Sequence, residues 1–160
     1  PPGSVVLLLS EYNRERIWDE NHHWGEAHLK LASSTLSHED SQSLVIKAHP
    51  RSDGNAALKL YTFLEGQLPG VEIHLLPTEL STLPIEAISM GLDYKAACSL
   101  GSCSLPSDIG IDVAHYTSPR IAKFFDEGWI GVPFWAKYAE ITRMLLAEGI
   151  CQDVESSQLP

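Results

Sequence analysis

The residues with the clearest chemical potential follow a short apolar run, in the stretch LVIKAHPRSDG from Leu44 to Gly54. The imidazole of His49 can donate a proton or a hydrogen bond to a phosphate oxygen, and Pro50 fixes the chain direction beside it. Lys47 and Arg51 add positive charge, although we expect only one of the two to face a ligand. By itself the His-Pro pair favours a plain strand end, so a binding site needs support from other segments.

Two further segments carry groups that suit a small anion or a nucleotide. Glu86 follows Pro84 at a helix start, where a carboxylate is stabilised by the helix dipole and can also accept hydrogen bonds from a sugar diol. The loop SLGSCSLPS offers Gly101, Ser102 and Ser104, whose amides and hydroxyls can approach a phosphate closely. Ordinary flexible loops have the same composition, so neither segment identifies a site alone.

Each of these segments lies after a predicted strand. Apolar runs predict strands at Val5–Leu9, Leu44–Ala48, Val71–Leu75, Asp93–Cys98 and Asp112–His115. Helical patterns fall over Trp24–Leu36, Asn55–Leu68, Ser81–Met90 and Phe134–Gly149, with a further helix start at Ser118. This alternation predicts an α/β fold, a Rossmann-like three-layer α/β/α sandwich with a mainly parallel sheet. Ligands of such sheets bind beyond the carboxyl ends of the strands, where all three segments are expected to meet.

Composition narrows the classes of partner. The 160 residues suit one domain, predicted to span 1–150 with a flexible tail at 151–160. Eleven basic against 21 acidic residues, a formal charge of −10, argue against a nucleic-acid surface. No apolar run approaches the roughly 20 residues of a membrane helix, and the opening PPGSVVLLLS does not have the basic start of a signal peptide.

No metal site and no cofactor are expected. The three cysteines fit no common zinc pattern and favour a reducing compartment. His22, His23 and His28 lie close in the sequence but do not share one helical face well, so they predict a surface cluster.

In their order along the chain, IKAHPRSDG, IHLLPTELSTLPIEAISMG and SLGSCSLPS resemble the donor-binding half of bacterial sialyltransferases. The resemblance is to the polysialyltransferase and lipooligosaccharide sialyltransferase families, and it covers about Val5 to Met144. These enzymes consist of two facing Rossmann-like domains, the GT-B fold, and use CMP-sialic acid. The resemblance implies that this chain is the C-terminal domain, which carries the His-Pro motif, a Pro-x-Glu-like helix start and a paired-serine motif.

The resemblance also implies roles for the candidate residues. His49 would contact the CMP phosphate and act as general acid for the leaving phosphate, and Pro50 would hold that loop. Ser102 and Ser104 would bind phosphate oxygens, although a cysteine separates what is often a contiguous pair. Glu86 would lie near the cytidine or its ribose. The family takes its general base from the N-terminal domain, so this chain alone is expected to bind the donor without completing transfer to a glycan acceptor.

Other functions stay open at this point. The same fold could hold a UDP- or GDP-sugar in another GT-B enzyme, or it could be a non-catalytic Rossmann-like binding module. The chain begins with Pro1 and not Met, so it could be a piece of a longer protein that includes the N-terminal domain. The resemblance implies a cytoplasmic protein, with a peripheral position at the inner face of the membrane as an alternative.

Overall fold

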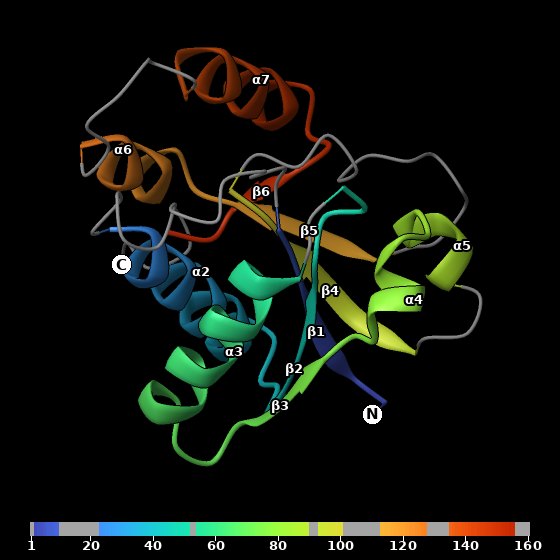
Figure 1. Cartoon of the computed structure of the whole chain (residues 1–160). Coiled ribbons are helices and arrows are strands. Elements are labelled where there is room, and N and C mark those ends of the chain that lie inside the picture. Colours follow the sequence, from blue (N-terminus) through green and yellow to red (C-terminus); the bar gives the residue numbers. More distant parts are fainter. Residues whose placement is uncertain are drawn as a thin grey trace.

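The computed structural model of the chain describes residues 2–9, 23–51, 54–89, 93–100, 113–127 and 135–155. Within them lies a six-stranded sheet in the spatial order β3-β2-β1-β4-β5-β6, and every neighbouring pair is parallel (Figure 1). The strands are β1 (Ser4–Leu8), β2 (Ser43–Lys47), β3 (Glu72–Leu75), β4 (Tyr94–Cys98), β5 (Ala114–Thr117) and β6 (Gln152–Asp153). The strand order reverses at β1, as in Rossmann-like sheets, so the predicted α/β class with a parallel sheet is confirmed.

Helices follow β1, β2, β3 and β5 along the chain. They are α2 (Trp24–His38), α3 (Asn55–Gln67), α4 (Thr78–Ser81), α5 (Ile85–Ser89), α6 (Pro119–Glu127) and α7 (Trp135–Ala147). Helix α5 follows Pro84 as predicted, but the single turn of α4 before it was not foreseen. Pro77 stands immediately before α4. Pro84 lacks the N–H group that a continuous helix would need at that position, so α4 and α5 are separate helices.

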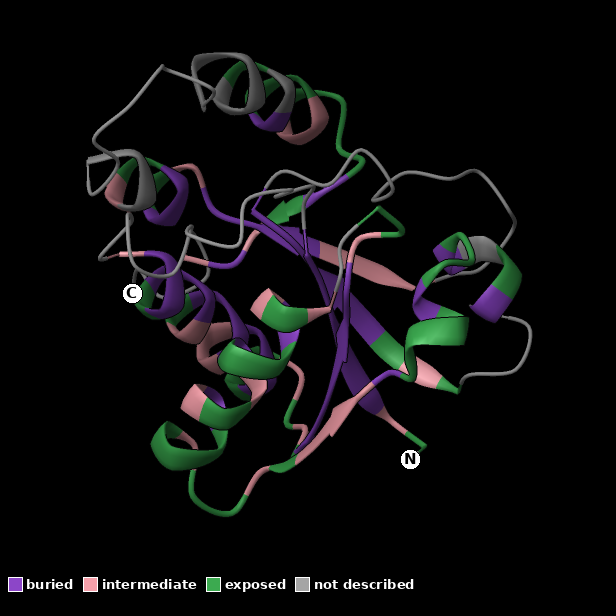
Figure 2. Cartoon of the chain, in the orientation of Figure 1, coloured by how far each residue is buried: buried purple, intermediate pink, exposed green. Residues whose placement is uncertain are grey.

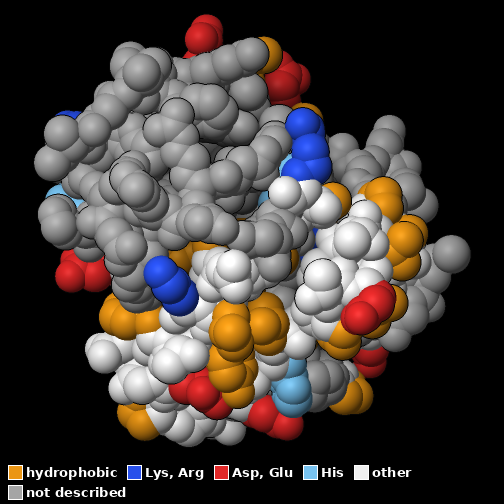
Figure 3. Space-filling model, in the orientation of Figure 1, with side chains coloured by type: hydrophobic (Ala, Val, Ile, Leu, Met, Phe, Trp, Pro, Cys, Tyr) orange, Lys and Arg blue, Asp and Glu red, His pale blue; other side chains and the backbone are white. Residues whose placement is uncertain are grey.

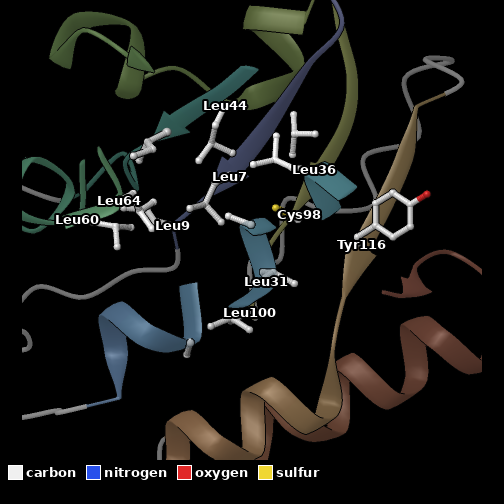
Figure 4. Packing of buried hydrophobic residues seen from close by; sticks show 14 of the residues in the cluster. Leu7, Leu9, Leu31, Leu36, Leu44, Leu60, Leu64, Cys98, Leu100 and Tyr116 are labelled. Atoms are coloured by element: carbon white, nitrogen blue, oxygen red, sulfur yellow. The ribbon is translucent and has the colours of Figure 1, made fainter. Parts of the chain in front are cut away.

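The central strand β1 is buried on both faces, which explains its continuous apolar sequence. Val5 and Leu7 pack in a cluster with residues of α2 and α3, and Figure 4 shows Leu7 among the leucines of that cluster. Val6 and Leu8 belong to a second cluster with the buried isoleucines of α5. Figure 2 shows the same contrast between the buried strands and the exposed outer surfaces of α3 and α4.

Residues 151–155 differ from the flexible tail expected for 151–160. Cys151 is 4% exposed and Val154 is 1% exposed. Strand β6 pairs with β5, and the Val154 N–H donates to the Thr117 carbonyl at 3.0 Å. A two-residue strand is too short for sequence periodicity to reveal, so only its contact with β5 identifies it.

Ser118 connects this segment to α6. Its Oγ donates to Oε2 of Glu155 at 2.6 Å and accepts the Ile121 N–H at 3.1 Å. The hydroxyl therefore caps the first turn of α6 and holds the end of the domain against it.

We expect Val154→Ala to lower the free energy of unfolding by about 2 kcal/mol, because it removes two buried methyl groups and leaves a cavity. Ile150→Ala is the matched control, since Ile150 is 44% exposed and should change stability by less than about 0.5 kcal/mol. Urea denaturation followed by circular dichroism measures both. Equally small losses of unfolding free energy in the two variants would mean that residues 151–155 do not pack against the sheet in solution.

His28 lies in the core and not in a surface cluster. It is 1% exposed, its Nδ1 bonds to the Trp24 carbonyl at 2.7 Å, and its ring contacts the Trp24 indole at a centroid distance of 4.7 Å. Burial lowers the pKa of His28 to about 4, because the charged imidazolium is poorly solvated there.

The lowered pKa predicts an acid-sensitive fold. Between about pH 6.5 and 4 the unfolded chain binds a proton at His28 that the folded chain does not bind, so stability falls as the pH falls. From pH 7 to pH 5 this group should cost about 2 kcal/mol of unfolding free energy. Urea denaturation at both pH values should show that His28→Leu removes this part of the loss. An equal pH dependence in the variant and the parent chain would refute the assignment.

Candidate functional site

The His-Pro turn lies at the carboxyl edge of the sheet, directly after β2. His49 is half-buried, whereas Pro50 and Arg51 are exposed. The Leu9 N–H donates to the Lys47 carbonyl at 3.0 Å, so the pairing of β2 with β1 continues up to the turn. On the other side of β2, the pairing with β3 also continues up to the turn. The turn is therefore held between the ends of two strands.

A cleft lies on the β3 side of this turn. Its volume is about 340 Å³, which includes space that is open to solvent. We call it the large cleft. It is lined by Ala48, His49, Pro50, Gly54, Ala57, Leu75, Leu76, Thr78, Ser81 and Thr82. Its apolar floor with a few hydroxyls on one wall is the usual composition of a small-molecule site.

A second hollow lies on the β1 side of the turn. Its volume is about 220 Å³ by the same measure, and we call it the small hollow. It is lined by Leu8, Leu9, Lys47, Ala48, His49, Pro50 and Ile85. Because Ala48, His49 and Pro50 line both spaces, the His-Pro turn forms the wall between them.

The start of α3 contributes to the large cleft. Gly54 is the residue before the helix, and its φ of 86° is a left-handed conformation that favours glycine. The first turn of α3 holds no acidic residue. The positive end of the helix dipole therefore lies beside the cleft without a carboxylate in that turn to oppose it.

The tautomer of His49 follows from one hydrogen bond. Its Nδ1 faces the Arg51 backbone N–H at 3.1 Å and accepts that hydrogen bond. A ring nitrogen that accepts carries no proton, so the neutral imidazole is protonated at Nε2. In this conformation His49 can donate a hydrogen bond to a ligand oxygen. It cannot also give up that proton as a general acid, because an imidazolate would result.

The two basic residues beside the turn point in different directions. Lys47 is 4% exposed, and its Nζ donates to the carbonyls of Ala48 at 3.3 Å and Ser81 at 3.0 Å. Arg51 is exposed. On the face shown in Figure 3, the Lys and Arg side chains of the described residues stand apart from one another, and no continuous basic surface forms among them there.

The remaining predicted residues can be placed only in part. Glu86 lies in α5, but its side chain is outside the described part of the chain. Gly101, Ser102 and Ser104 also lie outside the described residues. They follow in the sequence after β4, whose Cys98 pairs with Leu7 of β1, so the described end of β4 lies where the strand order reverses. Rossmann-like sheets bind ligands at that position.

The sequence analysis did not single out the hydroxyls of the large cleft, those of Thr78, Ser81 and Thr82. Such residues also mark helix starts, so their presence before Pro84 carried no separate signal. The position of LPTELST after a strand does place this segment at the predicted ligand edge, but it assigns no role to the hydroxyls.

Comparisons with protein-family models, with curated proteins and with solved structures each found no match. Among the described residues no group of three His, Cys, Asp or Glu side chains could hold a metal ion. None of the helices in the described ranges has the length and apolar character needed to cross a membrane. The fold and the site define a Rossmann-like α/β chain with a His-Pro turn between two hollows at the carboxyl edge of its sheet.

We expect nitrogen-15 NMR of the neutral His49 ring to show the Nε2–H tautomer. Arg51→Pro removes the N–H donor to Nδ1, so both tautomers should become populated in that variant. The Nδ1–H tautomer in the parent chain would exclude the hydrogen bond from Arg51.

Proposed function

We propose that this chain binds a nucleotide sugar at the carboxyl edge of its sheet, as the donor-binding domain of a glycosyltransferase. The donor proposed is CMP-sialic acid, because of the order of motifs along the sequence. The observation that carries the proposal is the position of His49, a hydrogen-bond donor held between two hollows at the edge where Rossmann-like sheets bind ligands.

The large cleft suits the nucleoside. Leu75, Leu76 and Ala57 offer apolar surface to a base. The Thr78 hydroxyl can bond to a ring or ribose oxygen, whereas the Thr82 hydroxyl already donates to a backbone carbonyl at 2.7 Å and can only accept from a ribose hydroxyl. The phosphate would then lie against the His49 imidazole, near the start of α3.

The proposed chemistry needs stabilisation of a leaving phosphate. In transfer from a CMP-sugar, the bond between the anomeric carbon and the phosphate oxygen breaks, and CMP leaves with the bonding electrons. A hydrogen bond from His49 Nε2–H lowers the energy of that charge. The acceptor hydroxyl must still lose its proton, and the proposal assigns that base to an N-terminal domain facing this one. A cytoplasmic protein, at times peripheral at the inner membrane face, belongs to the same proposal.

We expect His49→Ala to weaken CMP binding roughly ten- to a hundredfold, the effect of losing a hydrogen bond to a charged group. His49→Gln should lose less, because its amide can place a donor near the position of Nε2. His74→Ala is the control, since His74 lies on β3 outside the cleft lining, with its Nε2 3.1 Å from Oε1 of Glu72. Isothermal titration calorimetry measures the affinity of the parent chain and of each variant for CMP. Equal affinity in the parent chain and in His49→Ala would reject the site.

A thermal-shift panel of CMP, UDP and GDP tests the donor. At equal concentration a tighter ligand raises the melting temperature more, because the stabilisation grows with the logarithm of its concentration over Kd, so CMP should give the largest shift. A larger shift in melting temperature with UDP or GDP would mean that the donor is a UDP- or GDP-sugar and not CMP-sialic acid. No shift with any of the three would overturn the nucleotide site and favour a non-catalytic module.

A further inference from the structure

Strand β3 forms one edge of the sheet, so within the described residues it pairs on one side only (Figure 1). The N–H groups of Glu72 and Leu76 donate to carbonyls in and just before β2, at 2.8 Å and 2.9 Å. Alternate residues of a strand turn their backbone groups to opposite sides, so those of Ile73 and Leu75 point away from β2. None of the described residues bonds to these outward groups. Free backbone groups on a sheet edge can pair with another strand.

The side chains of this edge differ between the two faces of the sheet. Val71, Ile73 and Leu75 pack against the apolar cluster that includes α3, and all three are half-buried. Glu72 and His74 share the opposite face, where their side chains are 65% and 41% exposed. Nε2 of His74 lies 3.1 Å from Oε1 of Glu72, but no described residue forms a well-directed hydrogen bond with it. The edge thus presents apolar side chains on one face, and a carboxylate beside an imidazole on the other.

We propose that β3 pairs antiparallel with β3 of a second copy of this chain, about a two-fold axis at Ile73. The two Ile73 residues then exchange their free backbone hydrogen bonds. On the exposed face, each Glu72 lies directly opposite His74 of the second copy, and its carboxylate can accept from an imidazole N–H whether the ring is neutral or charged. On the face of α3, Val71 lies opposite Leu75 of the second copy, so apolar side chains pair with apolar side chains.

The side chains favour this register over one centred on His74. That register would set the two His74 rings opposite each other and Glu72 opposite Leu76, which is 8% exposed and apolar. Antiparallel pairing also turns the carboxyl edges of the two sheets in opposite directions, so the two large clefts lie at opposite ends of the joined sheet. The dimer is therefore independent of the proposed nucleotide site.

Sedimentation velocity over a dilution series tests the pairing in solution. An interface built on a strand of 4 residues is small, so we expect the parent chain to shift from dimer to monomer on dilution. Ile73→Pro removes the outward N–H but no hydrogen bond to β2. It should raise the dissociation constant of the dimer roughly tenfold or more, because two hydrogen bonds between the copies are lost.

Ile73→Val is the matched control, since it keeps the N–H and a β-branched side chain, and it should dimerise as the parent chain does. A parent chain that is monomeric up to its highest soluble concentration would overturn the inference. Equal dissociation constants in the parent chain and in Ile73→Pro would also overturn it, because the dimer would then form through another surface.

An exchange of side chains tests the register and covers the case in which Ile73→Pro does not fold. At neutral pH, His74→Glu sets two pairs of carboxylates opposite each other, so it should weaken the dimer roughly tenfold. Adding Glu72→His to this variant restores one carboxylate and one imidazole in each pair, and the dissociation constant should return close to that of the parent chain. A dimer that is weakened equally in both variants would place His74 opposite its own copy and contradict the proposed register. A dimer that is unchanged in both would exclude β3 from the interface.

Discussion

The burial of β1 on both faces is the constraint on which the rest of the structure depends. Its side chains alternate between two apolar clusters, one with α2 and α3 and the other with α5. A strand covered on both sides must have helices in its connections, and those connections make its neighbours parallel. Parallel strands bring all their carboxyl ends to one edge. The carboxyl ends of β1, β2, β3 and β4 therefore lie side by side there, although these strands are far apart in the sequence.

The His-Pro turn uses that edge in a specific way. The N–H of Arg51, two residues after His49, bonds to Nδ1 and so keeps the ring proton on Nε2. This changes the chemistry that the histidine can contribute: it stabilises negative charge by hydrogen bonding in this conformation, and proton donation would require the bond to Arg51 to break. The tautomer that this local backbone geometry sets leaves Nε2–H as the donor of the neutral ring, whereas the general acid implied by the resemblance needs a rearrangement of the turn.

Positive potential at this edge comes from a few oriented groups and not from a basic surface. The chain carries a formal charge of −10, and its exposed basic residues stand apart on the face shown in Figure 3. Beside the turn, however, lie the buried ammonium of Lys47, the start of α3 and the donor nitrogen of His49. A positive charge and a helix dipole in a desolvated surrounding are weakly screened, so such groups create local positive potential within an acidic protein.

The sequence by itself determined the α/β class, the strands before each candidate segment and the position of His49 after β2. These features depend on local apolar runs and on turn residues, which are properties of neighbouring positions. Tertiary structure decided which side of the turn Lys47 occupies, that His28 is buried, and that residues 151–155 close the sheet as β6. Each of these outcomes depends on what a side chain or strand meets from a distant part of the chain. Lys47 and Arg51 are four residues apart and equally basic, and only the fold around the turn buries one of them and exposes the other.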